Sequence, residues 1–107
     1  MGLLSTETLQ RLRENRNHDD PVPVVKLFTP YGNWAWLLAF QDGTDRDKLF
    51  GLCDMGIGQP ELGYVRLSTL EDYDIRGIVI EHDSGAVFDK PLSHYARTAR
   101  ENGKIVT

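Results

Sequence analysis

The residues of this chain that could do chemistry gather around a short glycine-rich stretch in the middle of the sequence. Cys53 and Asp54 end one apolar run, and Glu61 begins the next run after Pro60. A cysteine thiol acts as a nucleophile when a base lies within hydrogen-bond reach, and a carboxylate can serve as general acid or base. A histidine such as His82 would complete the set if folding brought it near. This pattern leaves open a small hydrolase or a metal-dependent enzyme.

The same residues also have a simpler interpretation. A single cysteine in a strand is usually a small buried hydrophobic residue. The three histidines, His18, His82 and His94, are remote from Cys53 in the sequence, so only folding could supply a base. No spacing of ligand residues matches a zinc or calcium signature, so we expect no metal site and no cofactor. We therefore prefer the hypothesis of a non-enzymatic protein.

Length and composition predict a single domain over residues 1–107. With 40% apolar residues, the 107-residue chain can bury one hydrophobic core. No apolar run approaches the roughly 18 residues that cross a bilayer, and the N-terminus lacks a signal-peptide pattern. The single cysteine is typical of a reducing compartment, so we expect a soluble, cytoplasmic protein. Sixteen acidic and twelve basic residues give a net charge of −4, which argues against nucleic-acid binding.

The expected secondary structure is that of an α+β domain. Ser5 is a suitable N-cap for a helix over residues 6–15, and Ser68 and Glu71 have the spacing of a capping box for a short helix over 69–73. A last helix begins at Pro91 and ends at Gly103. Strands are expected over residues 24–28, 34–40, 49–53, 62–67 and 77–82. Short connections favour a mainly antiparallel sheet of four to five strands, flanked by an N-terminal, a short middle and a C-terminal helix.

The segment 34–40 is apolar at every position, and it sets the expected centre of the sheet. A strand that is apolar on both faces is usually covered on both sides by other elements. The small side chains on one of its faces would let a helix approach closely. Strict alternation places Trp34, Trp36, Leu38 and Phe40 on one face and Ala35, Leu37 and Ala39 on the other.

Several short motifs, taken in order along the chain, resemble a known family. The motifs occupy residues 24–30, 34–37, 50–54, 60–65 and 68–71, and weaker ones follow at 81–83 and 92–96. The chain resembles the bacterial family catalogued as domain of unknown function twenty-nine fifty-eight. The resemblance implies a small protein, often carried on plasmids or other mobile elements, with no assigned activity. The chain departs from the expected pattern at His82, where a basic residue should separate Glu81 from Asp83.

Our preferred hypothesis is a module that binds a protein partner encoded by the host or the mobile element, for instance as an inhibitor of a host defence system. The candidate partner-binding residues are Tyr31, Trp34, Glu61 and Tyr64, because aromatic side chains exposed near the 55–61 loop would form a binding groove. An enzyme requires Glu61 and a histidine to converge in one pocket. An interaction module predicts that they are scattered, with an open sheet edge or an apolar patch instead.

Overall fold

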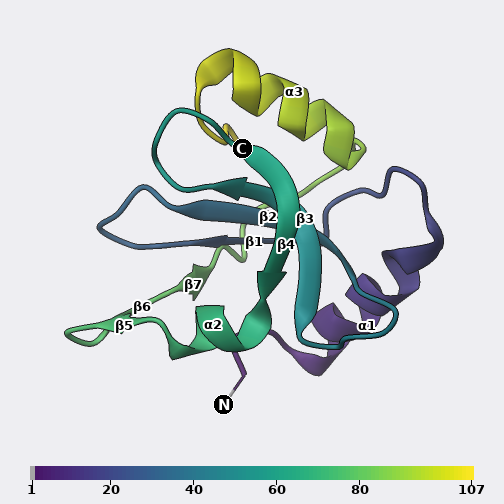
Figure 1. The fold of residues 1–107 in the computed structure, drawn as a ribbon, viewed down its shortest axis with the longest axis horizontal. Helices are drawn as coiled ribbons and strands as arrows, with labels where there is room; N and C mark the ends of the chain where they lie inside the picture. The colour runs from purple at the N-terminus through teal and green to yellow at the C-terminus, as the bar shows by residue number, and fades with distance from the viewer. Residues whose placement is uncertain (1) are drawn as a thin grey trace.

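The computed structural model describes residues 2–107, which form a twisted five-stranded sheet with helices on both faces (Figure 1). The strand order is β4-β3-β2-β1-β7, and all neighbouring strands are antiparallel. These strands are β1 (Val25–Phe28), β2 (Ala35–Gln41), β3 (Lys48–Asp54), β4 (Glu61–Arg66) and β7 (Glu81–His82). The remaining elements are α1 (Thr6–Glu14), the 3-10 helix η1 (Asn15–Asn17), α2 (Leu67–Asp72), α3 (Leu92–Asn102) and the hairpin of β5 (Asp74–Ile75) and β6 (Ile78–Val79). The predicted α+β class and its three helices are confirmed.

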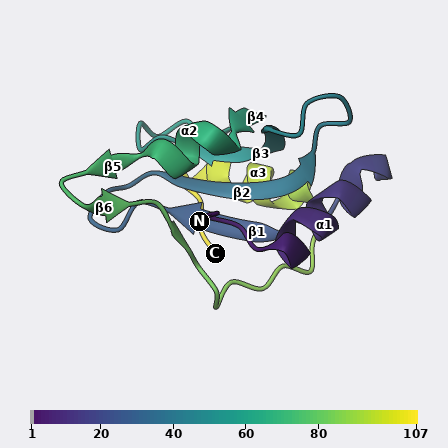
Figure 2. The same ribbon diagram turned by 90° about the horizontal axis from the view of Figure 1, so that it is seen from below.

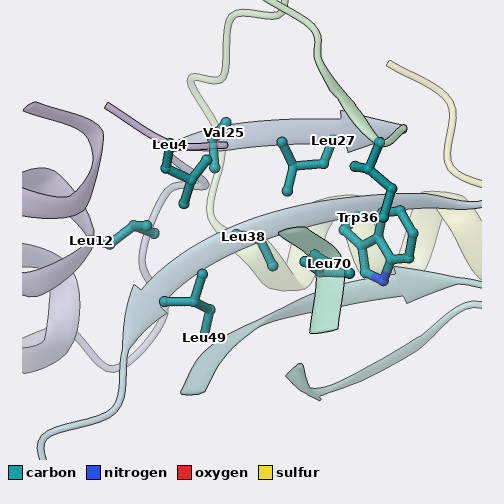
Figure 3. Packing of buried hydrophobic residues seen from close by; sticks show 9 residues of the cluster. Leu4, Leu12, Val25, Leu27, Trp36, Leu38, Leu49 and Leu70 are labelled. Atoms are coloured by element: carbon teal, nitrogen blue, oxygen red, sulfur yellow. The ribbon is translucent and has the colours of Figure 1, made fainter. Parts of the chain in front are cut away.

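Strand β2 lies in the middle of the sheet, as its composition predicts, and both of its faces are buried (Figure 2). One face belongs to a cluster under α1 and α2, here called the Trp36 cluster (Figure 3). The other face packs against α3, and we call this second group the α3 cluster. The Trp36 cluster contains Leu4, Leu12, Val25, Leu27, Trp36, Leu38, Leu49, Leu70 and Ile80. The α3 cluster contains Leu37, Ala39, Leu52, Leu92, Ala96 and Ala99.

A bulge in β2 changes which residues share a face. Leu38 pairs with Gly51, but the next pair is Phe40 with Phe50, so Ala39 is an extra residue in β2. Phe40 therefore packs with the α3 cluster, where its ring stacks on Phe50 at a centroid distance of 5.0 Å. The prediction that Phe40 shares a face with Trp36 is wrong, because strict alternation does not continue through a bulge.

Helix ends follow the predicted signals at α1 and α3. The Ser5 hydroxyl oxygen accepts the Thr8 N–H at 3.1 Å, and α1 ends at Glu14 with Asn15 as its C-cap. Gly103 ends α3 with a φ of 72°, in the left-handed region that glycine adopts without strain. Both local predictions are confirmed.

Two other local predictions are wrong. The capping box at Ser68 does not form: α2 starts at Leu67, two residues earlier than expected, and the Ser68 N–H and hydroxyl donate to the Asp47 carboxylate at 2.8 and 2.6 Å. The single strand expected over 77–82 is split into β6 and β7, with Ile80 buried in the Trp36 cluster between them. In both places a contact from a distant part of the chain overrides the local pattern.

The directly paired glycines Gly51 and Gly63 should differ strongly in how well they tolerate replacement by alanine. A Cβ at Gly51 would collide with the Leu37 carbonyl oxygen and lie 2.8 Å from Leu38 Cα, whereas a Cβ at Gly63 meets nothing within 4 Å. We expect Gly51→Ala to lower the free energy of unfolding by about 3 kcal/mol or more, since the backbone of β2 must shift. Gly63→Ala should change it by less than about 1 kcal/mol. Urea denaturation measures both, and equal losses would contradict the bulge geometry.

The Asp47 contact should make part of the stability depend on pH. Two hydrogen bonds from Ser68 lower the pKa of the Asp47 carboxyl. The bond from the Ser68 hydroxyl has the larger effect, and the bond from the Ser68 N–H has the smaller one. A carboxylate with a lowered pKa in the folded state contributes stability above its unfolded pKa and loses it as the pH falls through the folded pKa. We expect the difference in unfolding free energy between wild type and Asp47→Asn to shrink from about pH 6 to about pH 3. A pH-independent difference in urea denaturation would refute this role.

Candidate functional site

Three of the predicted catalytic residues lie in one row of paired residues that crosses the sheet. Glu61 pairs with Cys53, Cys53 with Trp36, Trp36 with Leu27, and Leu27 with His82. Because neighbouring strands are about 4.8 Å apart, about 14 Å separates Cys53 from His82 and about 19 Å separates Glu61 from His82. The buried side chains of Trp36 and Leu27 lie between them. The structure therefore does not bring these residues into one pocket.

Asp54, the other catalytic candidate, faces the opposite side of the sheet from Cys53, because adjacent strand residues alternate in direction. Its side chain is buried, and its two carboxylate oxygens accept the N–H groups of Gly56 and Ile105, each at 2.9 Å. These bonds tie the β3–β4 loop and the segment after α3 to the end of β3. Asp54 therefore has a clear structural role at this position.

The Cys53 thiol is half-buried and packs against the Trp36 cluster. Burial raises the pKa of Cys53 to about 11. The thiolate is the nucleophilic form, and a raised pKa keeps the group as a neutral thiol at neutral pH. Of the histidines, His94 lies on α3, which covers the other face of the sheet, and His18 is exposed after η1.

Two further properties of residues 2–107 bear on the class of site. No group of three or more His, Cys, Asp and Glu side chains in this range could hold a metal ion. None of the helices within it has the length and apolar character needed to span a membrane.

A hollow of about 490 Å³ lies on the α3 face, near the ends of β1 and β3. Its charged lining residues include Asp54 and Lys26. Both oxygens of Asp54 are occupied by backbone N–H groups. The Lys26 Nζ donates to the Thr107 carbonyl oxygen at 3.2 Å and lies 4.0 Å from the Asp83 carboxylate. These two charges therefore already have partners within the molecule.

Strand β4 forms an edge of the sheet with one side unpaired, since β3 is its only neighbour among the strands of residues 2–107. The Leu67 N–H donates to the Asp47 carbonyl oxygen at 2.8 Å, in line with the β3–β4 register. Hydrogen-bonded and non-hydrogen-bonded pairs alternate in an antiparallel ladder. The backbone groups of residues 61, 63 and 65 therefore face β3, and those of Leu62, Tyr64 and Arg66 face outward.

The side chains on this edge are apolar and exposed to an unusual extent. Leu62 is 38% exposed and Tyr64 is 50% exposed, both on the α3 face of the sheet. Native edge strands are commonly protected by being short, charged or covered. Strand β4 is six residues long and carries charge only at its ends, Glu61 and Arg66.

An apolar groove of about 400 Å³ lies beside β4 on the opposite face, the face of Trp36. The residues that line it come from β2, β3, β4 and α2, and from the segments next to them. The Trp34 ring lies 5.8 Å from the Tyr73 ring and 6.3 Å from the Trp36 ring, measured between centroids. The lining residues central to the argument are Trp34, Trp36, Cys53, Met55, Leu70 and Tyr73.

The candidate partner-binding residues are distributed unevenly around this edge. Glu61 and Tyr64 lie on β4, and Trp34 lies in the groove, with 36% of its surface exposed. Tyr31, at the β1–β2 turn, is 94% exposed and lines neither the groove nor the hollow. Sequence reasoning missed Leu62 and Tyr73. The alternation of Leu62 with Tyr64 was a usable signal, whereas nothing local indicated that Tyr73 would reach Trp34.

Comparison with known proteins gives one match. A family model described as "Protein of unknown function (DUF2958)" matches residues 3–106, nearly the whole chain, which confirms the resemblance carried by the sequence motifs. No curated protein matches the chain, and no solved structure does. The match assigns no activity.

The Cys53 thiol should react slowly with alkylating reagents. Its pKa is raised from 9.0 to about 11, so the thiolate at neutral pH should be about a hundredfold scarcer than for an ordinary cysteine. We expect the rate of iodoacetamide modification to keep rising with pH toward about 11, and to increase strongly in urea. The measurement is mass spectrometry of timed samples. A rate that levels off near neutral pH would mean an activated thiol and would revive the enzyme hypothesis.

Proposed function

The chain belongs to the DUF2958 family of proteins of unknown function, and we propose that it is a protein-interaction module that binds an extended segment of a partner along the open edge of β4. Addition of a strand to a sheet edge is a recurrent mode of peptide recognition. In this mode, backbone hydrogen bonds provide affinity and pockets for alternate side chains provide specificity.

The observation that carries the proposal is the unpaired side of β4. The N–H and C=O groups of Leu62, Tyr64 and Arg66 point outward and form a template for one further strand. An antiparallel segment opposite them would form up to six hydrogen bonds, two at each of these residues. The exposed side chains of Leu62 and Tyr64 would be covered by the same segment. No comparable arrangement supports the enzyme alternative, because three or more strand spacings of about 4.8 Å separate His82 from Cys53 and Glu61.

The partner in this proposal is a protein encoded by a bacterial host or by the plasmid or other mobile element that carries the gene. Inhibition of a host defence system is a specific version of the proposal, because a small module that caps a strand or segment of another protein can block its assembly. The interaction takes place in the cytoplasm, in keeping with the single unpaired cysteine. Nucleic acid is not a partner in this proposal, since the net charge is −4.

Replacement of Leu62 by proline should weaken partner binding without unfolding the protein. The Leu62 N–H faces away from β3, so proline removes a donor on the open edge while the β3–β4 hydrogen bonds remain. Loss of one backbone hydrogen bond, together with the bulk of the ring at the edge, should weaken binding by roughly tenfold or more. Affinity capture from a bacterial lysate, followed by titration of the captured partner, measures this loss.

The matched control is Leu62→Val, which keeps the N–H group and a branched apolar side chain. Both variants should unfold at nearly the same urea concentration as the wild type. A partner that binds the wild type and Leu62→Pro with equal affinity would rule out the β4 edge as the binding site.

A further inference from the structure

We infer that the groove beside β4 takes one large apolar side chain, aromatic or aliphatic, from the partner segment bound to this edge; the inference rests on the proposed function. The occupant is thus an extended peptide segment with a large apolar residue on the Trp36 face of the sheet. The groove selects that residue, and the open edge of β4 holds the backbone on either side of it.

The geometry of strand addition places a side chain next to the groove. Residues that pair directly across neighbouring strands share a face of the sheet. Partner residues opposite Glu61, Gly63 and Val65 therefore project to the Trp36 face, where the groove is lined by Val65 and Cys53. Gly63 has no side chain, and a Cβ placed on it meets nothing within 4 Å. An incoming side chain at this position has open space beside it.

The groove suits an uncharged side chain. Arg66 is the charged residue of its lining, and its guanidinium is 3.1 Å from the Asp45 carboxylate and 3.6 Å from that of Asp47. The charge at this rim is therefore balanced within the protein. The remaining surface is dominated by indole, phenol, thioether and aliphatic groups. A charged side chain would lose its hydration here without gaining an ion pair.

A second copy of the chain would not fill the groove. Two β4 strands paired with each other would offer only Glu61, Gly63 and Val65 on the Trp36 face. Glutamate is charged, glycine has no side chain, and valine is small for a cavity of this volume. A cavity of about 400 Å³ suits one large side chain of a different sequence. This argues for a partner protein over self-association.

Two synthetic peptides test the inference directly. Both are capped and eight residues long; in one, Phe alternates with Glu, and in the other, Ala alternates with Glu. The two tryptophans of the chain, Trp34 and Trp36, both line the groove, so their fluorescence reports its occupancy. We expect the Phe peptide to change this fluorescence and to bind roughly ten- to a hundredfold tighter than the Ala peptide. Both peptides should shift the backbone amide resonances of Leu62 and Tyr64.

A pair of variants separates the groove from the edge. Thr69→Phe places a ring on an exposed, groove-lining position of α2, and Asp72→Phe places it on the same helix outside the groove. Thr69→Phe should remove the preference for the Phe peptide and leave the amide shifts of β4 in place, whereas Asp72→Phe should bind both peptides like the wild type. Proline has no backbone N–H, so in Leu62→Pro the Tyr64 amide is the reporter, and its shift should be lost with both peptides at concentrations that shift it in the wild type.

The possible failures are distinguishable. Equal affinity for the two peptides, with β4 amide shifts that Leu62→Pro abolishes, would overturn the groove inference and leave the proposed function intact. Absence of β4 shifts with either peptide at millimolar concentration would overturn both. A concentration-dependent dimer whose formation protects the Leu62 and Tyr64 amides would overturn the inference by making a second copy the occupant.

Discussion

The central strand β2 has to be covered on both faces, and the rest of the architecture follows from that requirement. Strands β1 and β3 pair with its two edges. Helix α3 covers the face of Leu37 and Ala39, and α1 with α2 covers the face of Trp36 and Leu38. Within residues 2–107, three α-helices are available to cover the two faces of the sheet. Helix α3 packs over β2 and β3, so the outer face of β4 at Leu62 and Tyr64 stays open. The exposed edge is thus a consequence of where the helices are needed most.

Features that depend on neighbouring residues could be predicted from the sequence, and features that depend on distant contacts could not. The cap at Ser5, the helix stop at Gly103 and the central position of the 34–40 segment each follow from residues a few positions apart. The bulge at Ala39, by contrast, requires Gly51 in the next strand, where a side chain would strike the backbone of β2. The start of α2 is fixed by Asp47, twenty-one residues before Ser68. The β5–β6 hairpin was also not predicted. Its turn places Arg76 at a φ of 56°, a left-handed conformation that arginine seldom adopts, so the sequence gives no turn signal at this residue.

In the candidate site, too, local features could be predicted from the sequence and features that depend on distant contacts could not. Sequence reasoning could place Cys53, Glu61 and His82 at the ends or edges of strands, but their separation depends on strand order. Strand β7 pairs with β1 rather than with β4, so β7 and β4 lie at opposite edges of the sheet (Figure 1). His82 is in β7 and Glu61 is in β4. Strand order is a property of the whole sheet, and no local spacing encodes it. The fold presents an open sheet edge and exposed aromatic residues, which the preferred hypothesis of an interaction module expected.

The groove and the edge act as one surface because a polar network fixes the junction between β4 and α2. Arg66, the last residue of β4, binds Asp45 and Asp47, while the Ser68 N–H and hydroxyl of α2 donate to Asp47. Exposed ion pairs of this kind contribute little when isolated, but here several bonds converge on one loop. They set the direction in which α2 leaves the strand, and Leu70 then anchors the helix in the Trp36 cluster. The wall of the groove is therefore in place before any segment arrives, so the entropic cost of binding falls mainly on the partner, which must become extended.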